Sequence, residues 1–156
     1  MTNDSPAGAE SLPEYVTIVL DGQWFGLPIA RVQDVFMPQL LTRVPLSGPE
    51  IAGILNLRGR IVTALDLRCR LGLAPRQEGA PPMAVGIEWR GESYGLLVDA
   101  VGEVVKLADS GREPNPVNLD AKLAGVSAGV HRLDAQLMVV LDIERVLGSA
   151  AEPMAA

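Results

Sequence analysis

The chain contains one serine–histidine pair whose spacing could support nucleophilic chemistry. Ser127 stands between two glycines in Gly125-Val-Ser-Ala-Gly129, and His131, the one histidine of the chain, follows shortly after it. In a small β-barrel hydrolase, such a serine would be the nucleophile and the histidine its base. The same residues also fit a strand relieved by glycines, with a small residue in it. We favour the strand and keep the hydrolase as a remote alternative.

Cys69 is the second residue that could react. It lies between Arg68 and Arg70, and neighbouring cations can lower the pKa of a thiol. A small, half-buried residue in a short helix is the simpler interpretation. A single cysteine excludes an intramolecular disulfide and a cysteine-based zinc site, and a single histidine excludes a multi-histidine metal site. We therefore predict no metal site.

The carboxylates are scattered along the chain. Asp66, Asp99, Asp142 and Glu144 each end a predicted strand or open a predicted helix. Acids at these positions typically accept hydrogen bonds from free helix N–H groups, so we expect capping and not paired acid/base catalysis. The glycine-containing stretch 53–59 lacks the Lys-Ser/Thr ending of a phosphate-binding loop. The sequence predicts no catalytic residues, no cofactor and no enzyme.

Arginines form the one local charge feature. Arg58, Arg60, Arg68 and Arg70 fall close together in a chain of net charge −6, which disfavours nucleic acid and anionic membranes as partners. For the last three we expect a solvated hairpin and helix face. Arg58 differs because it is predicted at a hairpin bend beside Gly59, where a partner backbone can approach closely. A forked, permanently charged side chain there suits a protein interface.

Short strands must position these residues. The 156-residue chain is 48% hydrophobic and 21% charged, which is too apolar for a disordered chain. Its 16 glycines and 12 prolines indicate many turns. Strands are predicted on either side of three bends: Asp21-Gly22, Arg58-Gly-Arg60 and Arg90-Gly-Glu92. The expected strands are Tyr15–Leu20, Trp24–Leu27, Ile54–Leu57, Ile61–Leu65, Met83–Trp89, Ser93–Val98 and Leu137–Leu141, the last running into a short helix at Ile143–Leu147.

An internal repeat organises these elements. Phe25-Gly-Leu-Pro-Ile-Ala-Arg-Val-Gln-Asp-Val35 matches Tyr94-Gly-Leu-Leu-Val-Asp-Ala-Val-Gly-Glu-Val104 in its aromatic, Gly-Leu, Val and acid-Val positions. A second match follows in the same order, between Ile51-Ala-Gly-Ile54 and Leu123-Ala-Gly-Val126. The repeat predicts two similar β-rich halves.

The predicted domain boundaries follow from the repeat. We expect one domain over residues 13–148, with subdomain halves at about 15–75 and 83–148. Each half is marginal alone, so the halves should share or abut a core. Small closed sheets would suit such short strands. A flexible lead at 1–12 and a flexible tail at 149–156 are expected.

One stretch resembles a known family. Gly53-Ile-Leu-Asn-Leu-Arg-Gly-Arg-Ile-Val-Thr-Ala-Leu-Asp-Leu-Arg68 is similar to the signature of the CheW family of chemotaxis coupling proteins. Val32-Gln-Asp-Val35 resembles the family's Val-x-Glu-Ile element, and Gly95–Val104 resembles its counterpart in the second half. Leu137–Leu147 resembles its last strand and helix. The resemblance covers about 15–148.

The resemblance implies a mainly β fold of two small five-stranded β-barrels with short helices. It implies a non-enzymatic adaptor that couples the cytoplasmic tips of methyl-accepting chemoreceptors to the regulatory domain of the histidine kinase CheA. Arg58 would contact the receptor tip in the groove between the barrels. Asp34 stands where the family usually has Glu, which keeps the charge with a shorter reach. The other receptor-facing positions that match are Val32, Gly53, Gly59 and Val104.

The resemblance leaves some questions open. Kinase contacts should be mostly apolar and lie on the second barrel, but their residues are not assigned. The same adaptor could serve a non-flagellar chemosensory pathway, such as one controlling pilus motility. No Lys or Arg precedes Arg31, and no apolar run approaches the ~20 residues that span a bilayer. We therefore expect a cytoplasmic protein without direct membrane insertion, recruited to receptor arrays.

Overall fold

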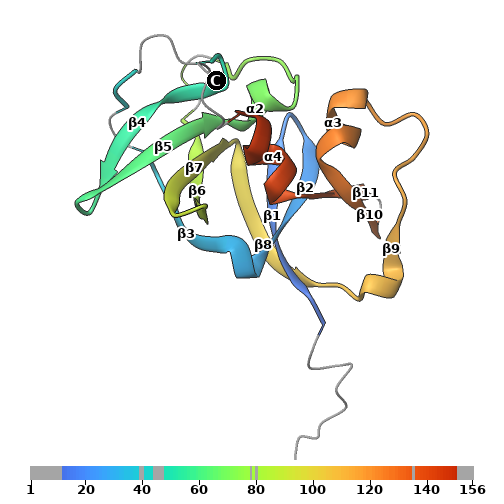
Figure 1. The fold of residues 1–156 in the computed structure, drawn as a ribbon. Coiled ribbons are helices and arrows are strands. Elements are labelled where there is room, and N and C mark those ends of the chain that lie inside the picture. The colour runs from blue at the N-terminus through green and yellow to red at the C-terminus, as the bar shows by residue number, and fades with distance from the viewer. Residues whose placement is uncertain are drawn as a thin grey trace, which may run out of the picture.

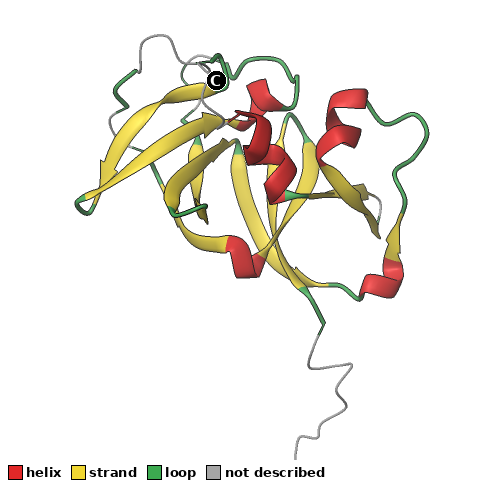
Figure 2. Ribbon diagram, viewed as in Figure 1, coloured by secondary structure: helices red, strands yellow, loops and turns green. Residues whose placement is uncertain are grey.

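The computed structural model describes residues 12–38, 41–43, 48–77, 79, 81–134 and 136–150, so most of the predicted lead and tail lies outside the described residues. Strands dominate the fold and the helices are short (Figure 2). The strands are β1 (Glu14–Leu20), β2 (Gln23–Pro28), β3 (Val32–Phe36), β4 (Ile51–Leu57), β5 (Arg60–Asp66), β6 (Met83–Trp89), β7 (Glu92–Val98), β8 (Ala100–Lys106), β9 (Arg112–Glu113), β10 (Ser127–Leu133) and β11 (Gln136–Leu141). The helices are η1 (Ile29–Arg31), α2 (Leu67–Arg70), η2 (Asp109–Gly111), α3 (Ala121–Val126) and α4 (Ile143–Ala150).

Three of the hairpins turn through two residues with positive φ. The φ angles are 53° and 77° at Asp21-Gly22, 52° and 82° at Arg58-Gly59, and 53° and 79° at Arg90-Gly91. Paired positive φ values are typical of the type I′ turn, whose twist matches that of the flanking strands. The turns predicted from the sequence are confirmed, and Arg60 and Glu92 already belong to the returning strands.

The strands form two sheets (Figure 1). One is six-stranded, in the order β8-β1-β2-β11-β10-β9, and the other is five-stranded, in the order β3-β6-β7-β5-β4. The mainly β architecture in two parts is confirmed. The expectation of two closed five-stranded barrels needs correction: β9 adds a strand to one sheet, and the ladders end at β8 and β9 in one sheet and at β3 and β4 in the other. Two open, curved sheets describe the fold better.

The sheets divide the chain differently from the predicted subdomain halves at 15–75 and 83–148. The five-stranded sheet uses continuous chain from β3 to β7, whereas the six-stranded sheet combines β1 and β2 with β8 to β11. The repeat is nevertheless real, because equivalent strands pair in equivalent registers. Val16 lies opposite Val104, just as Val85 lies opposite Val35. Each repeat thus gives its first hairpin to the sheet that the other repeat completes. Nothing in the repeat itself could show this exchange.

Both sheets contribute to one central hydrophobic core, as the sequence predicted for two small halves. Burying each large aliphatic side chain stabilises the fold by roughly 1.5–3 kcal/mol, so joining the cores matters for a chain of this size. A smaller cluster lies on each sheet: around Leu55 on the five-stranded sheet and around Met138 on the six-stranded sheet. The fully buried members of the central core include Ile18, Leu20, Phe25, Leu27, Leu65, Leu67, Val85, Ile87, Leu96, Val98, Val146 and Leu147.

Arg68 forms a polar connection between the sheets. Its guanidinium donates two hydrogen bonds to the Asp99 carboxylate, at 2.9 and 2.7 Å, and a third to the carbonyl of Ala74 at 2.7 Å. Asp99 also accepts the Asp21 backbone N–H at 2.8 Å. The Arg68 side chain is only 11% exposed. The expectation that Arg68 lies on a solvated face is therefore wrong, because α2 turns this residue toward the corner between β7 and β8.

Two of the four carboxylates predicted as helix caps have that role, whereas Asp99 accepts hydrogen bonds from Arg68 and the Asp21 backbone, and Glu144 accepts one from Trp89 Nε1–H. Asp66 accepts the Cys69 backbone N–H at the start of α2, and Asp142 accepts the Arg145 backbone N–H at the start of α4. Within the described residues, none of the helices has the length and apolar composition needed to cross a bilayer.

Candidate functional site

Ser127 and His131 do not form a catalytic pair. The Ser127 hydroxyl is buried and hydrogen-bonded to Asn115 Oδ1 at 2.6 Å and to the backbone of Gly129. His131 is buried against the Tyr15 ring, with 5.8 Å between ring centroids. Ser127 begins a strand that follows a helix, the reverse of the strand-to-helix order of a nucleophile elbow. The strand interpretation describes these residues, and the geometry gives the hydrolase no support.

Cys69 does not have the environment of an activated thiol. Burial, together with the nearby carboxylates of Asp66 and Glu50, raises the pKa of the Cys69 thiol. A raised pKa lowers the thiolate fraction and hence the reactivity of the sulfur. In the part of the chain that the structure describes, no three His, Cys, Asp or Glu side chains are grouped so that they could hold a metal ion.

Arg58 occupies the tip of the β4–β5 hairpin. Its backbone has the left-handed conformation of the turn, and the next position is glycine, which adopts φ 82° without strain. Asn56 fixes the turn, because its side-chain oxygen accepts the Gly59 backbone N–H at 2.8 Å. The Arg58 side chain is 73% exposed. A rigid turn therefore presents a forked cation to solvent.

Asp34 on β3 is the partner of this arginine. Its Oδ2 lies 3.4 Å from Arg58 Nη1 and 4.0 Å from Arg60 Nη2. The Asp34 side chain is only 23% exposed, and its Oδ1 is buried without a hydrogen-bond partner. The structure thus brings together Arg58, Gly59 and Asp34, which the sequence placed on one surface by resemblance, and adds Arg60 to them.

Gly53 shapes the same hairpin from its other end. It sits at a β-bulge with φ 156°, and a side chain there would approach the Thr42 carbonyl oxygen to 2.7 Å. The absence of a side chain allows the Thr42–Ile54 bridge to cover the edge of β4. Its observed contacts are those of a structural glycine.

Val32 stands two residues before Asp34 on β3, whereas Val104 lies on the other sheet. Val32 opens β3, is half-buried and packs against the central core. Val104 lies on β8 of the six-stranded sheet, opposite Val16, and is 49% exposed. β3 and β8 are both edge strands. At β3 the chain passes from the six-stranded to the five-stranded sheet, and at β8 it passes back. A partner that touches all the predicted positions must therefore contact both crossover strands.

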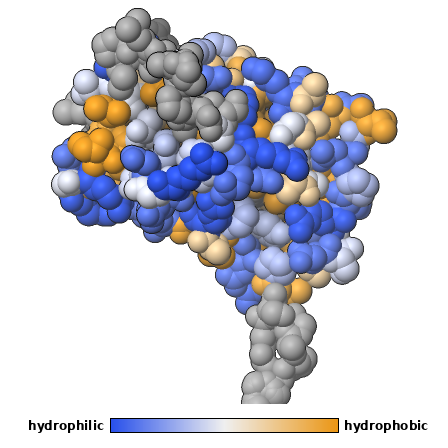
Figure 3. Space-filling view, in the orientation of Figure 1, coloured by the Kyte–Doolittle hydropathy of each residue, from blue (hydrophilic) through white to orange (hydrophobic). Residues whose placement is uncertain are grey.

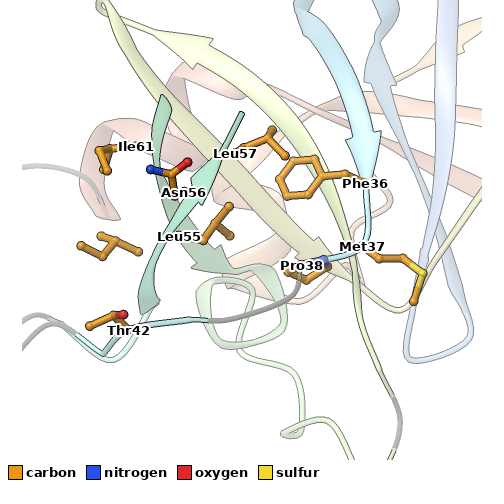
Figure 4. A pocket seen from close by; sticks show the side chains of 9 residues that line it. Phe36, Met37, Pro38, Thr42, Leu55, Asn56, Leu57 and Ile61 are labelled. Carbon is orange, nitrogen blue, oxygen red and sulfur yellow. The ribbon is translucent and has the colours of Figure 1, made fainter. Parts of the chain in front are cut away.

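An apolar groove lies beside the Arg58 turn. It encloses about 390 Å³ between the end of β3 and the β4–β5 hairpin (Figure 4). Met37 and Ile61 at this groove are 58% and 61% exposed. Figure 3 shows apolar surface over the β4–β5 hairpin and a second apolar tip over the loop between β9 and α3, where Val117 is fully exposed. The sequence missed this groove because β3 and β4, although consecutive in the chain, are the two opposite edges of the five-stranded sheet, and no local pattern shows that their side chains meet.

An exposed arginine turn, steadied by a carboxylate and flanked by apolar surface, is characteristic of a protein-binding module. Comparison with known proteins agrees. The family profile described as CheW-like domain matches residues 14–151. The chain therefore belongs to the family of CheW-like domains.

Named relatives support this assignment. The chemotaxis protein CheW of Thermotoga maritima is 26% identical over 141 residues, covering 89% of this chain and 91% of that protein. The chemotaxis protein CheW of Klebsiella aerogenes is 25% identical over 143 residues, covering 92% of this chain and 86% of that protein. The crystal structure of scaffolding protein TtCheW from Thermoanaerobacter tengcongensis superposes with a TM-score of 0.83 at 26% identity, covering 99% of this chain and 97% of that chain.

Proposed function

We propose that this protein is a non-enzymatic chemotaxis adaptor in the cytoplasm that couples the tips of membrane chemoreceptors to the regulatory domain of the histidine kinase CheA. The observation that carries the proposal is the Arg58 turn, which sits in the family's signature segment and is presented to solvent from a rigid hairpin. The match to CheW-like domains over residues 14–151 and the similarity to a scaffolding protein support it. The mechanism would be binding without chemistry, with a conformational bias passing between partners as coupling free energy.

The receptor surface is proposed around Arg58. Apolar contacts would supply most of the affinity, and the guanidinium would fix register and specificity. Asp34 would steady the arginine, while Val32 and Val104 would extend the contact along the crossover strands β3 and β8. Gly53 and Gly59 would contribute by shaping the hairpin.

The kinase would need a separate surface, which we propose on the six-stranded sheet. Val117 is a candidate because it is fully exposed on a loop that is held at both ends. Asn115 on one side is hydrogen-bonded to Ser127, and Leu119 on the other packs against the central core. A fixed loop loses little entropy when its apolar tip is covered.

Co-sedimentation with chemoreceptor-containing membranes, with and without CheA, tests both surfaces. Arg58→Ala is expected to weaken receptor binding by about 2 kcal/mol, a roughly thirtyfold rise in Kd, and to leave kinase binding unchanged. Val117→Ser is expected to do the reverse. Arg90→Ala is the matched control, since Arg90 holds the same turn position on the β6–β7 hairpin and stacks on Trp89 instead. Equal receptor binding by wild type and Arg58→Ala would contradict the proposed receptor surface.

A further inference from the structure

The space above Gly86, which has no side chain, is what allows the Asp34 carboxylate to reach the Arg58 turn. Asp34 lies directly opposite Gly86 in the ladder between β3 and β6. A side chain built on Gly86 would overlap Asp34 Oδ1, and the next nearest atoms, at 3.3 and 3.5 Å, also belong to Asp34. The backbone of Gly86 has an ordinary strand conformation, so glycine is not needed there for its φ angle. Its role is steric, because the Asp34 carboxylate occupies the space that a side chain would fill.

The other sheet shows the alternative arrangement. In the repeat, Thr17 on β1 corresponds to Gly86 on β6, and Glu103 on β8 corresponds to Asp34 on β3. Each of them is next in the chain to one of the valines that lie opposite each other in the two sheets. Thr17 is buried, and its hydroxyl donates to the Glu103 backbone carbonyl at 2.7 Å. The Glu103 residue is exposed. In the six-stranded sheet, the Thr17 side chain fills this position and Glu103 faces solvent. In the five-stranded sheet, Gly86 leaves the position empty and the Asp34 carboxylate packs into it.

We propose that Gly86 is a positioning residue of the Arg58 site, which sets the orientation of Arg58 by making room for the Asp34 carboxylate. The carboxylate packs one oxygen into the space at Gly86, and its other oxygen pairs with Arg58 and Arg60. A steadied arginine loses less side-chain entropy when a partner binds. The consequence for receptor binding rests on the proposed function, whereas the steric relation among these three residues does not.

A double-mutant cycle between positions 86 and 34 tests the proposal. Gly86→Ala and Asp34→Ala are each expected to weaken binding to receptor-containing vesicles by about three- to tenfold, the effect of one side chain losing its order. The double variant should bind no more weakly than Asp34→Ala alone, because Gly86 acts only through Asp34. Asp34→Glu, with one more methylene, should restore part of the binding lost in Gly86→Ala. Additive losses, or unchanged binding in Gly86→Ala, would overturn the proposal.

A second measurement does not depend on any partner. The Asp34 carboxyl carbon and the Arg58 Nε–H resonances, followed by NMR, should shift in Gly86→Ala, while Thr17→Gly should leave both unchanged. If Gly86→Ala fails to fold, Asp34→Ala should restore folding, since the overlapping atoms belong to Asp34; a double variant that stays unfolded refutes the steric relation. Wild type that fails to bind receptor while Gly86→Ala shifts these resonances would count against the proposed function and not against the role of Gly86.

Discussion

Replacing Arg68 by alanine should destabilise the protein strongly, because this side chain connects the two sheets. It follows β5 of the five-stranded sheet, and its partner Asp99 stands where the chain passes from β7 to β8 of the six-stranded sheet. Asp99 in turn accepts the backbone N–H of Asp21 in the β1–β2 turn. Removal of the guanidinium leaves a poorly solvated carboxylate, whereas the exposed Ala74 carbonyl can bond to water instead.

The magnitude follows from the exposure of the pair. Breaking a fully buried ion pair costs about 3–5 kcal/mol, whereas exposed pairs contribute about 0–1 kcal/mol. The Arg68 side chain is 11% exposed and the Asp99 side chain 24%, so the pair lies nearer the buried case. We expect a loss of about 2–3 kcal/mol in the free energy of unfolding, which corresponds to a urea midpoint lower by about 1 M.

Arg132→Ala is the matched control. Arg132 also makes a two-point pair, with Glu113 at 3.4 and 3.1 Å, but the two side chains are 66% and 44% exposed. This variant should lose less than about 1 kcal/mol. Urea denaturation followed by tryptophan fluorescence compares the two. If Arg68→Ala is no less stable than Arg132→Ala, the reasoning from burial is refuted.

Acid titration tests the Arg68–Asp99 pair through the Asp99 carboxylate. The hydrogen bond from Arg68 is the main cause that holds the pKa of Asp99 below its ordinary value, against the opposing effect of burial. A lowered carboxyl pKa stabilises the folded state above about pH 4, and this contribution is lost as pH falls through the lowered pKa. The stability difference between wild type and Asp99→Asn should therefore be full at neutral pH and narrow below about pH 4.

Three other predictions concern single residues. Burial, aided by Arg112, lowers the pKa of His131, so the free energy of unfolding should fall as pH drops below about 6.5. In His131→Gln, urea denaturation at pH 7.5 and 5.5 should no longer show this pH dependence. Cys69, which is half-buried and whose thiol pKa is raised, should react with a disulfide reagent more slowly in the native protein than after unfolding in guanidinium; equal rates would contradict this environment. Gly53→Ala should cost about 1–3 kcal/mol and lose hydrogen-exchange protection at the Ile54 amide, because the added carbon meets the Thr42 carbonyl; retained protection would show that the bridge adapts.

The sequence predicted the hairpin strands well, because alternating β-formers flank Asp-Gly and Arg-Gly pairs that only a tight turn accommodates. It did not predict β3 and β8 as strands. Both are edge strands without a fully buried residue, so neither shows the regular apolar pattern of the others. Their repeat signature indicated only that they are equivalent.

The site was predicted in part for a related reason. Arg58 and Asp34 were placed on one surface by resemblance, and the structure brings them within 3.4 Å. The partnership of Arg68 with Asp99 and the space above Gly86 depend on strands that meet only in the folded chain. No local pattern encodes such contacts, so they needed the three-dimensional arrangement.

The exchange of hairpins between the repeats also determines the order in which the chain can fold as it is synthesised. The β1–β2 hairpin emerges first, but its neighbours in the sheet, β8 and β11, lie beyond the whole five-stranded sheet. At about 5–20 residues per second, the hairpin waits on the order of ten seconds for β11. During this time Ile18, Leu20 and Phe25 lack their final covering from the late strands. Once the chain has emerged from the ribosome as far as Val98, all strands of the five-stranded sheet are outside it, while the β1–β2 hairpin still lacks its partners in the sheet. At this stage the exposed apolar face of the hairpin would be a target for chaperones.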